Sequence, residues 1–136
     1  MIVDTDTDSA TSLALFLEKE LPRVRAFPVT TPEDALQVLE EREIELVIAD
    51  YRLAAENGIE FLARVREARP NVKTILVTAY AEPSIFATAV GRARVDGLFV
   101  KPVDYMELAR SVNRMFEGPE RKDDPYPWKP VFRRRP

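Results

Sequence analysis

Carboxylate, hydroxyl and ammonium side chains stand just beyond the short apolar segments of this sequence. They are Asp4 with Asp6 close by, Asp50, Thr78 and Lys101. In open α/β sheets, ligands bind beyond the carboxyl ends of the strands, which meet at one edge of the sheet. If the apolar segments are parallel strands, these side chains therefore converge on one site.

The chemistry of such a site follows from its groups. Clustered carboxylates repel one another unless a hard cation neutralises them, and oxygen ligands with open water positions suit Mg²⁺. An aspartate is also a nucleophile in phosphoryl transfer, and Asp50 is the candidate. The hydroxyl of Thr78 and the ammonium of Lys101 would then stabilise the phosphoryl oxygens.

Each residue also has a simpler explanation. Asp50 alone fits a turn or a helix cap, Thr78 alone fits a strand end, and Lys101 alone fits a solvated surface charge. The coincidence of all these groups at successive strand ends favours a joint site.

The elements that would position the site alternate between strand and helix patterns. The predicted strands cover 2–3, 24–29, 44–49, 74–77 and 98–100. The predicted helices cover 9–20, 32–41 and 59–68, then one that begins at Pro83 and a last one that begins at Asp104 and stops at Gly118. This order predicts an α/β fold, (βα)5, with a doubly wound parallel five-stranded sheet covered on both faces. A length of 136 residues suits one such domain.

Composition excludes several functions. Histidine and cysteine are absent, which excludes a Ser-His-Asp triad, a thiolate nucleophile, a disulfide and a His/Cys zinc site. Residues 1–117 carry a net charge of −6, against +3 for residues 118–136, so no nucleic acid partner is expected. No apolar run reaches the ~18 residues of a membrane span, and the start lacks a signal-peptide pattern, so we expect a cytoplasmic protein without membrane contact.

Three segments together carry a family resemblance. They are Glu45–Leu53 followed by Asn57-Gly58, then Leu76–Tyr80, and then Phe99–Pro102. In this order and at this spacing, they resemble the receiver domain of bacterial response regulators, the chemotaxis-regulator-like phosphoacceptor module of two-component signalling. The resemblance covers about residues 2–117.

The resemblance implies a role for each candidate residue. Asp50 would be the phosphoacceptor, Thr78 the switch hydroxyl that binds phosphate, and Lys101 the phosphate-binding lysine. Asp4, Asp50 and the backbone carbonyl of Arg52 would place Mg²⁺, with Asp6 as a possible substitute for a second acid. The family's sheet order is 2-1-3-4-5, a flavodoxin-like winding.

The resemblance also implies partners. A histidine kinase or phosphotransfer protein would donate the phosphoryl group, and a downstream protein target would bind the face from Gly91 to Phe116, with a homodimer also possible. The chain would then be a signalling switch in a phosphorelay and not an enzyme. A flavodoxin-like enzyme ranks last, because the first loop has no glycine-rich phosphate cradle and no second acid–base pair is evident.

The sequence departs from the family pattern at three places. Thr5 stands where the second acid of the pair is expected, and Leu98 stands where an aromatic ring usually couples to the switch hydroxyl. The distance from Thr78 to Lys101 is about one residue longer than is common, with the extra length near 91–94. The first two departures keep an alternative open: an atypical receiver, or pseudo-receiver, that binds partners independently of phosphorylation.

The region 118–136 is a separate Pro-rich basic tail, predicted to be extended or disordered. One interpretation is a solvated extension or linker, which we favour. The other is a docking peptide with Trp128 as an aromatic anchor between Pro127 and Pro130.

Overall fold

The computed structural model describes residues 1–117 and 131–133. The strands are β1 (Ile2–Val3), β2 (Pro28–Val29), β3 (Leu46–Asp50), β4 (Lys73–Thr78), β5 (Gly97–Val100) and β6 (Val131–Arg133). The helices are α1 (Thr7–Glu20), α2 (Pro32–Glu41), α3 (Gly58–Ala68), α4 (Pro83–Thr88), the π-helix η1 (Ala89–Ala93) and α5 (Tyr105–Glu117).

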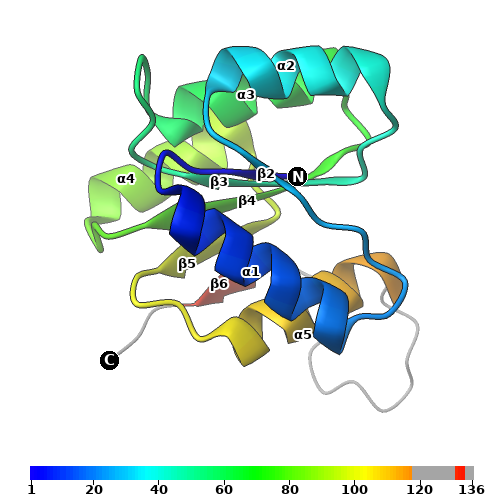
Figure 1. The fold of residues 1–136 in the computed structure, drawn as a ribbon. Helices are drawn as coiled ribbons and strands as arrows, with labels where there is room; N and C mark the ends of the chain where they lie inside the picture. Colours follow the sequence, from blue (N-terminus) through cyan, green and yellow to red (C-terminus); the bar gives the residue numbers. More distant parts are fainter. Residues whose placement is uncertain (118–130, 134–136) are drawn as a thin grey trace.

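The strands form one parallel sheet in the order β2-β1-β3-β4-β5-β6. The predicted order 2-1-3-4-5 is confirmed for the first five strands. The short strand β6 adds a sixth position that the prediction did not include. It lies beside β5 at the end of the sheet (Figure 1).

Helices cover both faces of the sheet, with α1 and α5 on one face and α2, α3 and α4 on the other (Figure 1). Strand side chains alternate between two hydrophobic clusters, as the pleat requires. Ile2, Ile48 and Phe99 pack in the cluster that includes residues of α1 and α5. Their neighbours Val3 and Val47 pack in the cluster that includes residues of α2 and α3. Both faces of the sheet are thus buried, which explains the nearly continuous apolar strands.

Polar side chains cap the starts of α2 and α5. The Thr31 hydroxyl accepts a hydrogen bond from the Asp34 N–H at 3.1 Å, at the start of α2. The Asp104 carboxylate accepts one from the Met106 N–H at 3.0 Å, at the start of α5. These side chains satisfy N–H groups that have no partner inside the helix.

The second strand is shorter than predicted. The sequence favours a strand over 24–29, but only Pro28 and Val29 pair with β1, opposite Ile2 and Val3. A strand is defined by its partner, and β1 itself holds only two residues. The remaining predicted residues lead from α1 to the sheet as irregular chain.

The predicted helix from Pro83 is confirmed, but it ends differently from an ordinary α-helix. After Thr88 the chain continues as the π-helix η1, and Arg94 follows with a left-handed φ of 52°. A π-helical turn accommodates an additional residue within a helix. This turn lies in the segment between Thr78 and Lys101, which is about one residue longer than the family pattern that the sequence resembles.

Gly91 in η1 provides a first prediction. An added Cβ at Gly91 would meet no atom within 4 Å. Gly91→Ala is therefore expected to stabilise the protein by about 0.5–1 kcal/mol, because alanine has less conformational entropy to lose on folding. Urea unfolding measures this change. A lower midpoint would show that the π-helical turn depends on the conformational freedom of glycine.

Within the described residues, no helix is both long and apolar enough to cross a membrane. The predictions for the tail concern residues that lie mostly outside the described part of the chain, including the Pro127–Pro130 segment.

Candidate functional site

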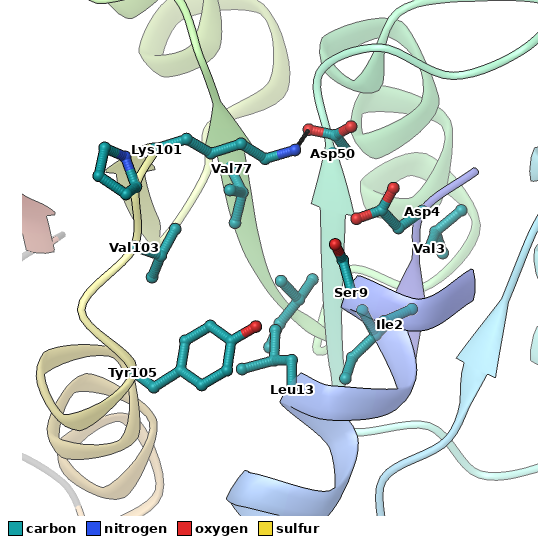
Figure 2. A pocket seen from close by; sticks show the side chains of 13 residues that line it. Ile2, Val3, Asp4, Ser9, Leu13, Asp50, Val77, Lys101, Val103 and Tyr105 are labelled. Carbon is teal, nitrogen blue, oxygen red and sulfur yellow. Dashed lines mark ion pairs between the residues drawn. The ribbon is translucent and has the colours of Figure 1, made fainter. Parts of the chain in front are cut away.

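A pocket of about 580 Å³ opens between α1, α5 and the carboxyl ends of the central strands. Asp4, Asp50 and Lys101 line it together, and Figure 2 shows their charged groups beside one another. The walls are formed by Ile2, Val3, Ser9, Ala10, Leu13, Ile48, Val77, Pro102, Val103 and Tyr105. The structure therefore brings three of the predicted site residues together, as polar groups above a mostly apolar interior.

The pleat explains why these three residues share a site. Asp4 and Asp50 each lie two residues beyond an apolar side chain, Ile2 and Ile48, that points toward α1 and α5. Lys101 has the same relation to Phe99. Because side chains two residues apart lie on the same face of a strand, all three are directed to the same side of the sheet.

Asp50 forms the centre of the site. Its Oδ1 lies 3.1 Å from the Lys101 Nζ, and it also accepts a hydrogen bond of 3.1 Å from the Tyr51 N–H. The Asp50 side chain is 11% exposed, against 39% for Lys101. An incoming group can thus reach Asp50 from the pocket, and the lysine is already placed beside the carboxylate.

Asp4 is the more buried carboxyl, with 8% of its surface exposed. Burial raises its pKa above the ordinary value, and the hydrogen bond from the Asp6 N–H, at 2.9 Å, acts in the opposite direction. The carboxylate of Asp50 adds to the rise in pKa, while the ammonium of Lys101 opposes it. A cation in the pocket would relieve both the burial cost and the repulsion.

Asp6 acts as a helix cap. It is the N-cap of α1, where its Oδ1 accepts hydrogen bonds from the N–H groups of Asp8 and Ser9. Its Oδ2 accepts one from the Ser9 hydroxyl at 2.9 Å, and these bonds lower its pKa. Asp6 does not line the pocket, and its oxygens are engaged at the start of α1.

Thr78 ends β4 but does not line the pocket. It follows Val77, whose side chain lies on the pocket side, so the alternation of the strand directs Thr78 to the opposite side. Thr78 is fully buried, and its hydroxyl accepts a hydrogen bond of 2.9 Å from the Tyr80 N–H. The Thr78 backbone nevertheless lies close to Asp50 and Lys101. Val77, the residue before it, pairs with Asp50, and the Thr78 carbonyl accepts a hydrogen bond from the Lys101 N–H.

The side chains of Tyr51, Arg52 and Tyr80 form a cluster next to Asp50 that the sequence did not predict. The Arg52 guanidinium carbon lies 5.1 Å from the centroid of the Tyr80 ring, within cation–π range. The Tyr51 ring meets the same Tyr80 ring edge-on, with the centroids 5.8 Å apart. Arg52 lies two residues past Asp50 and Tyr80 two residues past Thr78 in the sequence, and only the fold shows that the two side chains touch.

Gly58 belongs to a segment that carries the family resemblance, but the sequence did not reveal its close approach to Asp50. A Cβ at this position would lie 2.2 Å from the backbone oxygen of Asp50 and 3.0 Å from Leu76 Cδ1. Its N–H donates to the Tyr51 carbonyl at 2.7 Å, and Asn57 caps α3 just before it. The absence of a side chain at Gly58 lets the start of α3 approach the Asp50 backbone.

The donor set fits Mg²⁺ in its chemistry. Asp4 and Asp50 offer carboxylate oxygens, which hard cations prefer, and Mg²⁺ commonly retains several waters and needs few protein ligands. No group of three acidic side chains able to hold a metal occurs in the part of the chain that is described. The Arg52 carbonyl lies in the loop after β3, where Arg52 and Asn57 form an isolated bridge.

Comparison with known protein families matches residues 1–113 to the response regulator receiver domain. The chain belongs to this family. The prediction from the sequence is thereby confirmed: residues 1–113 form a receiver domain of two-component signalling.

Solved receiver domains have the same fold. A CheY-like receiver domain protein from Methanospirillum hungatei is 28% identical, with a TM-score of 0.78 over 85% of this chain and 90% of that one. The BeF3-activated DrrB receiver domain is 25% identical, with a TM-score of 0.76 over 85% of this chain and 94% of that one.

Curated relatives include proteins of very different length. A 14.6 kDa protein of Leptolyngbya boryana, from the sodA1 3′ region, is 33% identical over 84% of this chain and 86% of its own length. The response regulator RpfG of Xanthomonas campestris, a cyclic di-GMP phosphodiesterase, is 28% identical over 86% of this chain. This receiver domain spans only 31% of RpfG, and 20% and 24% of two transcriptional regulators that it also matches.

Proposed function

We propose that this receiver domain is a phosphorylation switch whose acceptor is Asp50. A histidine kinase or phosphotransfer protein would supply the phosphoryl group. A carboxylate oxygen of Asp50 would form a bond to phosphorus while the bond from phosphorus to the donor's histidine nitrogen breaks, leaving its electron pair on that nitrogen. The observation that carries this proposal is the placement of Asp50, accessible from the pocket with the Lys101 ammonium at 3.1 Å.

The neighbouring groups have complementary roles in this proposal. Lys101 would pair with the negative oxygens of the phosphoryl group once the Asp50 oxygen has become part of the acyl phosphate. Mg²⁺, held by Asp4, Asp50 and the Arg52 carbonyl, would neutralise charge on the phosphoryl oxygens. Thr78 would donate its hydroxyl to the phosphoryl group after leaving its hydrogen bond with Tyr80. Because Thr78 would exchange the Tyr80 N–H for the phosphoryl group, phosphorylation would change the conformation at the end of β4.

The output of the switch would be protein contact through the face from Gly91 to Phe116. Large apolar side chains are exposed there, with Met106 at 41% and Phe116 at 47%, and Val90 just before this face is at 48%. Exposed apolar groups of this kind are typical of interaction surfaces. A target protein or a second copy of the chain would bind this face.

The alternative function is a pseudo-receiver that binds partners independently of phosphorylation. Two observations favour it. Thr5 is exposed and carries no carboxylate, while Asp6 is engaged as a helix cap. Leu98 is 1% exposed in the core and has no ring to couple to Thr78.

Magnesium dependence tests the proposal and separates it from the alternative. We expect incubation with a small-molecule phosphodonor to give one phosphoryl adduct, measured by intact mass, that requires Mg²⁺. Thr5→Asp adds a carboxylate and should raise Mg²⁺ affinity on the order of tenfold, about 1.4 kcal/mol, in a calorimetric titration. An adduct in Thr5→Asp but none in the parent would instead support the pseudo-receiver.

The cluster of Arg52 and Tyr80 predicts a long-lived phosphorylated form. The two side chains pack against each other beside the acceptor, where they would limit the approach of water to the phosphoryl group. The variant Arg52→Asn with Tyr80→Glu should lose its phosphoryl group faster, on the order of tenfold, which is about 1.4 kcal/mol in the barrier. Time-resolved intact mass measures both decay rates, and equal rates would contradict this role.

A further inference from the structure

The outer edge of β5 is the feature that the function proposed above leaves unexplained. An edge strand normally presents a row of unpaired N–H and C=O groups, which can pair with a strand of another chain. Here Val131–Arg133 form β6 on this edge, parallel to β5, with Gly97 opposite Val131 and Phe99 opposite Arg133. Figure 1 shows this short strand beside β5, at the end of the sheet.

The edge lies within the predicted target-binding face. One side of β5 packs with η1, since Leu98 and Val100 share a cluster with Ala89 and Ala93. The other side packs with α5, since Phe99 shares a cluster with Leu108 and Val112. Three of the four exposed large hydrophobic side chains among the described residues lie on these flanking helices: Val90, Met106 and Phe116. An edge with apolar flanks is the surface to which added strands bind.

We infer that the β5 edge is a strand-acceptor surface and that its occupant is the chain's own segment Val131–Arg133. This segment covers the edge intramolecularly, so a target or second copy that needs the edge must displace it. The pairing is only three residues long, and so short a strand opens at a low free-energy cost. Only the consequence for targets rests on the proposed function; the pairing itself does not.

Hydrogen exchange of the full, unphosphorylated chain tests this inference. In a parallel strand alternate N–H groups point to the neighbour, so two variants cover both possibilities: Phe132→Pro, and Val131→Pro with Arg133→Pro. At least one of them should accelerate exchange tenfold or more for those amides of Gly97–Val100 that do not bond to β4. Asp123→Pro, with its proline outside the strand, should leave these rates unchanged.

The outcomes are distinct. Equal exchange in the parent and both variants would overturn the inference, because β5 would then have no partner to lose. Protection that rises when the protein concentration is raised tenfold would also overturn it, because the occupant would then be a second copy. Unchanged exchange of β3 amides verifies that the variants remain folded. Since no phosphodonor or Mg²⁺ is present, either result leaves the phosphoacceptor proposal untouched, and failure of that proposal leaves this test intact.

Discussion

Replacement of Asp50 by asparagine is expected to abolish the phosphoryl adduct completely. Asparagine keeps the size of the side chain but has no carboxylate oxygen with which to form an acyl phosphate. The fold should persist, because the partner Lys101 is 39% exposed and its charge remains solvated. We expect a change in the free energy of unfolding within about 0.5 kcal/mol. Intact mass after incubation with phosphodonor and Mg²⁺ measures the adduct, and urea unfolding measures stability.

Asp8→Asn is the matched control for this experiment. Asp8 is an exposed acid in the first turn of α1 and does not line the pocket, so this variant should form the adduct as the parent does. An adduct that survives in Asp50→Asn would place the acceptor on another residue and remove the basis of the proposed function. Loss of the adduct in both variants would show a general effect of charge and not a specific acceptor.

Substitution of Gly58 by alanine is the second change with a large expected effect. The new Cβ would lie 2.2 Å from the Asp50 backbone oxygen, which is closer than atoms can approach without displacement. The nearest atom belongs to the backbone, which cannot rotate away as the end of a flexible side chain can. Either α3 or the end of β3 must therefore move. We expect a loss of about 1–3 kcal/mol in stability, typical of overpacked sites. Phosphorylation should slow by about tenfold or more, because catalysis is sensitive to small displacements of the reacting group.

Gly91→Ala makes the same chemical change where there is open space, and it serves as the control. It should stabilise the protein slightly, as stated above, and leave the phosphorylation rate unchanged, whereas Gly58→Ala should lower both stability and rate. Denaturant unfolding and the initial rate of adduct formation compare the two variants directly. If the two substitutions had the same effect, the close approach of Gly58 to Asp50 would not be a constraint on the site.

The sequence predicted the fold and most of the site because both depend on local pattern. Apolar segments alternate with helical periodicity, which implies a parallel sheet, and polar residues that follow such strands must gather at one edge. Asp4, Asp50 and Lys101 line one pocket at this edge. The roles of these residues remain predictions until phosphorylation is measured.

The placement of Thr78 and Asp6 depended on details that the spacing of polar residues does not reveal. Thr78 is one residue out of phase with the pocket face of its strand, and its hydroxyl is bonded to the Tyr80 N–H. Asp6 lies near Asp4 in sequence, but a helix begins beside it, and its oxygens satisfy the free N–H groups of that helix.

By itself, the sequence determined the order of the first five strands and the five α-helices, the family and the residues at the strand ends, since these follow from periodicity and residue type along the chain. Only the tertiary structure decided which groups touch. The contact of Arg52 with Tyr80, the approach of Gly58 to Asp50 and the pairing of β6 with β5 each join separate segments of the chain. Their physical cause is packing between these segments, and no local pattern encodes the distance between two surfaces that meet only after folding.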